Sequence, residues 1–188
     1  MKTLPIVFVL IVVAGHTSAQ APDFRNVRWG MSVEAVKAAE TSKLSQDSPR
    51  KLVYDCTLAD NETKLFYVFS ASNKLARTKY FVTPDYINMI FYIRDFKLIQ
   101  ELMIKKYGKP VSISPRAISK SAIPEEEWAA FLAAGELQVE VVWSLPTMDV
   151  QLTLSKVGEK PAIQIDYMSR EYYKQDLKER SELAMKDL

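Results

Sequence analysis

The chain has 188 residues, and its 25 lysines and arginines nearly balance its 23 aspartates and glutamates. The formal net charge of +2 therefore gives no electrostatic reason to expect nucleic acid or an anionic membrane as a partner. Its only cysteine, Cys56, excludes an intramolecular disulfide and a site built from several thiolates. Its only histidine, His16, lies close to the N-terminus.

Residues 1–19 have the pattern of a cleavable secretory signal peptide. Lys2 supplies a positive charge, an apolar run covers 4–14, and small residues lead to a predicted cleavage after Ala19. An uncleaved anchor is the alternative, but the run is much shorter than the ~20 residues of a spanning helix. No cysteine directly follows the run, so a lipid anchor is not expected. We therefore expect an exported protein, periplasmic in a Gram-negative source and otherwise secreted, with no membrane span in the mature form.

Cleavage of this leader would leave a body without histidine, because His16 lies inside it. Catalytic groups of the Ser-His-Asp or Cys-His type would then be impossible, and so would zinc or copper sites that need an imidazole. From the sequence we predict no catalytic residue, no metal site and no cofactor.

The first half of the body is typical of an α+β unit over residues 20–110. Ser32 can cap a short helix, and the polar stretch 41–50 predicts a loop. Pro84 favours the start of a long helix that ends at Gly108. Three strands are expected between the two helices, at 51–58, 64–70 and 74–82.

A linker is expected over 111–122, and a second α+β unit over 123–188. Pro124, followed by three glutamates, favours a short helix. Apolar and polar residues then alternate, which indicates antiparallel strands with one wet face. These strands are expected at 137–145, 148–154 and 163–167. Ser169 can cap a last helix. Its apolar side carries Tyr173, Leu177, Ala184 and Leu188.

Each unit is thus predicted to contain a helix, three strands and a helix. The fold class is α+β, with antiparallel strands in one or two sheets and helices packed on one side. The order of elements repeats, and a true duplication of the two units stays open.

The run F-R-N-V-R-W-G-M-S at 24–32 resembles the F-R-x-x-x-W-G-x-S opening of a group of small exported bacterial proteins of uncharacterised function, and the run 106–110 is similar to a later motif of that group. More distantly, 30–32 is similar to a helix opening of the SmpA-type outer-membrane assembly lipoproteins. The expected order of helices and strands is similar to that of proteinaceous β-lactamase inhibitors. The chain lacks the lipid-bearing cysteine of the former and the disulfide pairs of the latter. These two resemblances imply a protein that binds another protein and catalyses no reaction.

The strand segment 65–69 is apolar on both faces. It is either a central strand covered on both sides or part of an exposed aromatic surface that binds a partner. For the second case, Phe66, Val68 and Tyr80 are the candidate residues for binding a partner or ligand. Trp29 is a further candidate, and its alternative role is to pack against the first helix.

Two features keep a hydrolase open as the alternative function. Ser48 and Lys51 match the S-x-x-K pattern of serine–lysine enzymes, although Pro49 argues against the helix that this pair needs. Carboxylates on predicted strands could serve glycoside hydrolysis, but they alternate with the apolar residues, as solvated side chains do. They are Asp55, Glu140, Asp149 and Asp166. The leading hypothesis is an exported, non-catalytic protein that binds another protein or an apolar ligand in the cell envelope.

Overall fold

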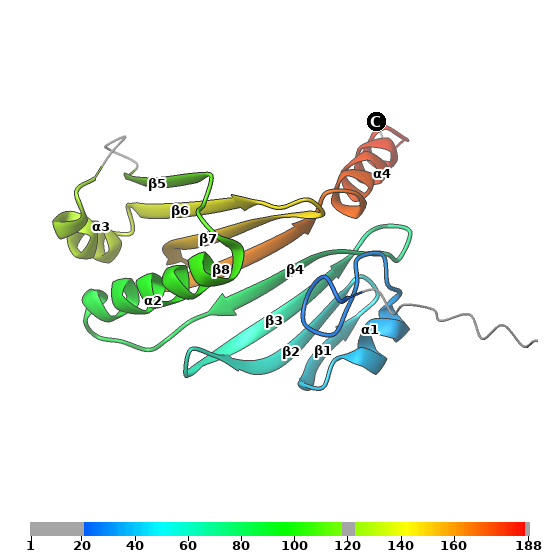
Figure 1. Ribbon diagram of the computed structural model, residues 1–188, viewed down its shortest axis with the longest axis horizontal. Coiled ribbons are helices and arrows are strands. Elements are labelled where there is room, and N and C mark those ends of the chain that lie inside the picture. The colour runs from blue at the N-terminus through cyan, green and yellow to red at the C-terminus, as the bar shows by residue number, and fades with distance from the viewer. Residues whose placement is uncertain (1–20, 118–122, 187–188) are drawn as a thin grey trace, which may run out of the picture.

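The computed structural model describes residues 21–117 and 123–186, and its eight strands form one antiparallel sheet in the order β1-β2-β3-β4-β8-β7-β6-β5 (Figure 1). The first half contributes β1 (Lys43–Ser48), β2 (Lys51–Leu58), β3 (Asn61–Phe69) and β4 (Leu75–Val82). The second half contributes β5 (Ser112–Ala117), β6 (Leu137–Ser144), β7 (Met148–Val157) and β8 (Lys160–Ser169). The predicted α+β class with an antiparallel sheet is confirmed. The predicted signal peptide, 1–19, lies outside the described residues.

The described residues form four α-helices and one short 3-10 helix, η1 (Glu125–Glu127), which leads into the third of them. The α-helices are α1 (Val33–Ala39), α2 (Met89–Tyr107), α3 (Trp128–Ala134) and α4 (Tyr172–Lys186). In Figure 1 α1 and α2 lie in front of the sheet and α3 lies beside the left end of β6, and the buried residues of all three belong to one hydrophobic core with the strands. α4 stands at one end of the sheet, where it contacts β4 and β8.

The face of the sheet beneath α1, α2 and α3, here called the covered face, is apolar because alternate residues of each strand point to the same side. On β7, for example, Val150, Leu152 and Leu154 are fully buried. The predicted stripe of α2 meets this face. It consists of Tyr92, Phe96, Ile99 and Met103, all buried. One side of the sheet therefore holds the core.

The opposite face, here called the open face, has no helix over its middle in the described part of the chain. On β6 to β8 it carries mostly polar side chains that are partly exposed, as expected for a surface in contact with water. Residues of this kind are Gln138, Gln151, Ser155 and Gln164. An antiparallel sheet with one dry and one wet face is the result.

Two strands lie in segments that were expected to be a loop and a linker, and both form edges of the sheet. β1 lies in 41–50, and five of its six residues are exposed, so no apolar alternation marks it. β5 lies in 111–122 and contains Pro115, a residue that sheets tolerate at their edges because it lacks an N–H group. The first half therefore has four strands, and in the second half a strand precedes the helix. The expected arrangement of two units, each with a helix, three strands and a helix, is therefore not confirmed: four strands lie between the helices of the first half, and only the part from 123 onward has the expected order.

Strands of both predicted units share one sheet because β4 pairs with β8. The chain's last strand thus lies in the middle of the sheet rather than at an edge. Across this seam Lys79 is the register partner of Asp166.

The predicted apolar side of the last helix is exposed beyond Tyr173, which is itself half-buried. Leu177 on this side is 50% exposed and Ala184 is also exposed, whereas Leu188 lies outside the described residues. The buried side chain of α4 is Asp176. The helix docks through polar contacts at the end of the sheet, where Glu179 accepts hydrogen bonds from the backbone and hydroxyl of Ser72 at 3.2 and 2.9 Å. The spacing of apolar residues along α4 could not show which side of the helix packs against the sheet.

Candidate functional site

Phe66 and Val68 lie together on the open face of β3, beside Phe81 of β4. The rings of Phe66 and Phe81 meet edge to face, with centroids 6.5 Å apart. These three residues, here called the open-face patch, are half-buried and form the apolar part of a shallow hollow. The rest of the hollow is lined by Arg77, Lys79 and Gln164.

The other face of β3 explains why its sequence is apolar on both sides. Leu65, Tyr67 and Phe69 are fully buried on the covered face, while Phe66 and Val68 remain partly exposed on the open face. β3 is therefore a strand in the interior of the sheet, but it is covered on one face only. Its open face contributes to an accessible apolar surface.

Tyr80 points to the opposite side of the sheet from Phe66. Its register partner on β3 is Leu65, so its side chain lies on the covered face and is only 8% exposed. Its hydroxyl accepts a hydrogen bond of 3.4 Å from Arg25, and burial raises its pKa. The structure therefore places Phe81, and not Tyr80, next to the two candidates of β3.

Two cations beside the open-face patch share one carboxylate. Arg77 donates to Asp166 from Nε at 2.8 Å and also from Nη2, and Lys79 Nζ lies 3.3 Å from the second carboxylate oxygen. Lys79 also donates to Gln164 at 2.7 Å. Because two positive charges meet one negative charge, this side of the patch keeps a net positive charge.

Trp29 lines a different hollow, between the N-terminal segment and the start of α4. Its backbone N–H donates to Asp23 at 3.0 Å, and its buried indole N–H has no partner in the described residues. The glycine that follows, Gly30, has φ +80°, and a Cβ built on it would lie 2.4 Å from the ring of Tyr172. The motif around Trp29 thus lets the segment pass closely under α4, and Trp29 does not join the open-face patch.

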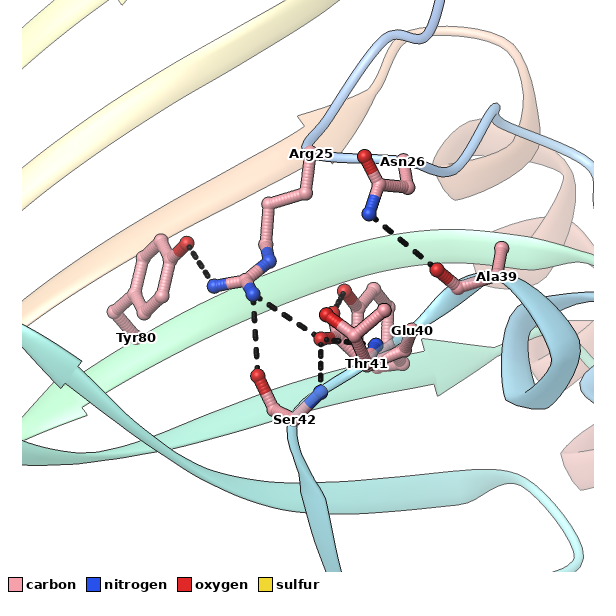
Figure 2. Close-up of polar contacts among 8 residues, drawn as sticks. Arg25, Asn26, Ala39, Glu40, Thr41, Ser42 and Tyr80 are labelled. Atoms are coloured by element: carbon pink, nitrogen blue, oxygen red, sulfur yellow. Dashed lines mark hydrogen bonds and ion pairs between the residues drawn. The ribbon is translucent and has the colours of Figure 1, made fainter.

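A buried polar cluster around Glu40 fastens the N-terminal segment and the end of α1 to the sheet (Figure 2). The Glu40 carboxylate accepts hydrogen bonds from Arg25 at 3.1 Å and from the backbone N–H groups of Thr41 and Ser42 at 2.9 and 2.8 Å. The Tyr67 hydroxyl donates to its other oxygen. The Glu40 side chain has no exposed surface, and these donors compensate its buried charge.

The surroundings of Glu40 set the ionisation of this cluster. Burial alone would raise the pKa of Glu40, but the hydrogen bonds from Tyr67 and Ser42 and the charge of Arg25 outweigh it and hold the pKa below its ordinary value. Burial and the neighbouring carboxylate both raise the pKa of Tyr67. The cluster therefore contains an anion, a cation and neutral phenols, which suits an anchor. No pattern in the sequence pointed to this cluster, because a glutamate at the end of a helix is ordinarily solvated.

The S-x-x-K pattern lies in a hairpin rather than on a helix. Ser48 ends β1, Lys51 starts β2, and the two are register partners on either side of a tight turn. The helical spacing that brings such a serine and lysine together in enzymes is therefore missing at this position.

All four carboxylates considered for hydrolysis form salt bridges. Asp55 bonds to Lys64, which lowers the pKa of that carboxyl. Burial would raise the pKa of Asp149, but the hydrogen bonds of Arg170 and Ser144 and the nearby positive charges together outweigh it, so the pKa is lowered. Glu140 pairs with Arg116 at 2.9 Å, and Asp166 pairs as described above. A general acid of a glycosidase needs a raised pKa, which neither Asp55 nor Asp149 has.

Cys56 is half-buried, and burial raises the pKa of its thiol, which disfavours the reactive thiolate.

Over 21–117 and 123–186, no three His, Cys, Asp or Glu side chains gather in a way that could hold a metal ion. Within the same ranges, every helix is too short or too polar to cross a membrane. Comparison with protein-family models, with curated proteins and with solved structures gives no match for this chain.

Proposed function

We propose that this chain is an exported, non-catalytic protein that uses the open-face patch to bind an apolar segment of another protein in the cell envelope. The observation that carries the proposal is the position of Phe66, Val68 and Phe81 in the middle of a sheet face that is polar over most of β6 to β8. Contiguous apolar surface that stays accessible on a water-facing side is typical of a contact with a partner.

The shape of the site favours a protein segment over a small ligand. Small ligands are held in cavities that enclose most of their surface, whereas the hollow at the open-face patch is shallow. Extended or helical segments of proteins bind to such surfaces by placing a few apolar side chains into them.

The charge beside the patch indicates what the partner segment carries. Arg77 and Lys79 share Asp166, so an acidic residue flanking the partner's apolar side chains would find a cation within reach. Complementary charge of this kind contributes to specificity and to the association rate. The preferred partner is therefore an apolar segment with an acidic flank.

Site-specific photo-crosslinking in an envelope extract of the source organism tests the proposal. A photoreactive residue in place of Val68 should give a protein adduct, and the same residue in place of Gln151, on the polar part of the open face, should not. Phe66→Ser should abolish the adduct at position 68 without unfolding the protein, because Phe66 is only partly buried. An adduct that persists in Phe66→Ser would contradict the proposed site.

A further inference from the structure

The helix α2 exposes more large apolar side chains than any other element of the described chain. Among them Phe91, Leu98 and Leu102 are 41%, 46% and 49% exposed. The helix crosses the covered face over β8 and β7, and its outer side is turned away from the sheet (Figure 1). This surface therefore lies on the opposite side of the sheet from the open-face patch.

The three residues form one apolar stripe along α2, here called the α2 stripe. Phe91 and Leu98 are seven residues apart and Leu102 follows four residues later, so all three lie on the same side of the helix. The stripe that packs on the core is separate and contains Phe96 and Ile99 among others. The fold thus leaves a second apolar side of α2 open to water.

Basic side chains lie on both sides of the α2 stripe. Lys105 and Lys106 follow Leu102 by three and four residues, which places one of them on each side of it, and both are exposed. Arg94 lies near the start of the stripe, and its side chain is 61% exposed. Lys109, in the turn that follows α2, is exposed as well.

The acidic side chains around α2 do not cancel this charge. Asp95 is buried and bonds to Arg94 at 3.1 Å, while Glu101 is exposed. Two acids next to the helix are held by lysines, Glu125 by Lys97 and Asp85 by Lys160.

Three lysines of this region therefore have no ion pair among the described residues, and Glu101 is the one unpaired acid of α2 beside them. The three lysines are Lys105, Lys106 and Lys109. Their excess of two positive charges is as large as the formal net charge of the whole chain. The positive charge is thus concentrated beside an exposed apolar stripe.

We propose that the α2 stripe binds the surface of an anionic lipid membrane, with α2 lying parallel to it. The apolar side chains enter the boundary between headgroups and acyl chains, as those of interfacial amphipathic helices do. Lys105 and Lys106 reach the lipid phosphates, because a lysine can lay its apolar stem along the stripe while its ammonium group stays at the headgroups. In this orientation the open-face patch faces away from the membrane and stays accessible.

The shape and the charges of this surface favour lipid over a second protein. The stripe lies on the convex side of a helix, and a fluid lipid surface adapts to such a shape, whereas a folded protein needs a matching groove. The unpaired lysines add electrostatic attraction to the apolar contact only where the lipids are anionic. An anionic membrane is therefore the preferred occupant.

Co-sedimentation with lipid vesicles tests the proposal. The chain from Gln20 onward is used, because it contains every described residue and lacks the apolar run 4–14, which could bind lipid by itself. It should bind vesicles of phosphatidylglycerol and phosphatidylcholine at least about tenfold more strongly than vesicles of phosphatidylcholine alone. High salt should remove most of this difference, and equal binding to both kinds of vesicle would contradict the role of the lysines.

Two double variants separate the apolar contribution from the electrostatic one. Leu98→Gln with Leu102→Gln should weaken binding to the mixed vesicles at least about tenfold. The circular dichroism spectrum should not change, because both leucines are about half exposed. Lys105→Gln with Lys106→Gln should also weaken binding at least about tenfold, since each basic residue near an anionic surface contributes about fivefold.

The matched controls lie on α4. Leu177→Gln replaces a leucine that is 50% exposed, and Lys174→Gln with Lys178→Gln removes two exposed lysines. Neither control should change vesicle binding. If the controls weakened binding as much as the variants of α2, the contact would not lie at the α2 stripe and the proposal would be wrong.

A fluorescent dye shows whether the α2 stripe enters the membrane. In a Cys56→Ser background, an environment-sensitive dye on Leu98→Cys should shift to shorter wavelength with the mixed vesicles, whereas the same dye on Leu177→Cys should not. A chain that leaves the mixed vesicles unbound would overturn the proposal. So would a dimer in solution that dissociates in the double leucine variant, because the stripe would then be a contact between protein chains.

Discussion

Replacing Glu40 by glutamine removes the buried charge of the polar cluster with little change in shape. Glutamine keeps one carbonyl oxygen, which can still accept the backbone N–H groups of Thr41 and Ser42. It no longer attracts the guanidinium of Arg25, which lies 3.1 Å from the carboxylate in the wild type. The variant therefore isolates the contribution of the ion pair that ties the N-terminal segment to the sheet.

The expected cost follows from the burial of the two partners. Removing one member of a buried ion pair costs about 3–5 kcal/mol. The Glu40 side chain is fully buried, but the Arg25 side chain is 29% exposed, so water can solvate part of the cation left behind. We therefore expect Glu40→Gln to lower the free energy of unfolding by about 2–3 kcal/mol at pH 7.

The loss should depend on pH in a defined direction. The pKa of Glu40 is lower in the folded protein than its ordinary value of 4.5, so its contribution to stability is complete above that value. The contribution disappears as the pH falls through the lowered pKa, because the protonated carboxyl no longer attracts Arg25. Glutamine does not titrate, so the difference between wild type and variant should narrow in acid.

Urea unfolding at several pH values from 7 downward measures this difference. Glu62→Gln is the control, since Glu62 is exposed on β3 and its loss should change stability by no more than about 0.5 kcal/mol. The reasoning would be refuted if Glu40→Gln behaved like this control at pH 7. It would also be refuted if the loss stayed constant as the pH fell.

Three further predictions concern stability and are measured by the same unfolding assay. Gly30→Ala should lower the free energy of unfolding by about 1–2 kcal/mol, because its φ of +80° disfavours a residue with a Cβ. The new Cβ should also clash with the ring of Tyr172, and this additional loss of stability should disappear in a Tyr172→Ala background. Leu152→Ala on the covered face should lower the free energy of unfolding by about 2–5 kcal/mol, whereas Val142→Ala on the open face should lower it by less than about 1 kcal/mol. Equal losses in the two variants would contradict the assignment of the two faces. Asp166→Asn should lower the free energy of unfolding by about 1–3 kcal/mol, because Arg77 and Lys79 lose the negative charge that they share. The loss should be smaller at high salt, where anions screen these two cations, and a loss that is independent of salt would contradict this explanation.

The interior strands and α2 could be predicted because their burial leaves a period in the sequence. Val150, Leu152 and Leu154 alternate with polar residues, and Phe96, Ile99 and Met103 recur at helical intervals. β1 could not be predicted in this way, since an exposed edge strand needs no apolar face. An edge strand forms through backbone hydrogen bonds to its neighbour, and the order of apolar and polar side chains does not reveal that pairing.

The candidate site could be predicted only in part, because faces of neighbouring strands are related by register. Phe66 and Val68 are two residues apart on one strand, so their common face follows from alternation alone. Whether Tyr80 or Phe81 joins them depends on the turn before β4 and on the irregularity of register near Val68. A shift of one residue exchanges the two faces, and no residue type in this turn determines that shift.

The position of β8 in the middle of the sheet has a consequence for how the chain matures. Arg77 of β4 bonds to a residue that the ribosome adds 89 positions later, so β4 has no partner on that side while the intervening chain is being made. Unpaired strands are open to pairing with other chains, and contacts between distant positions form slowly. A nascent chain that stops before Lys160 keeps an open edge at β4 instead of closing into a smaller finished domain.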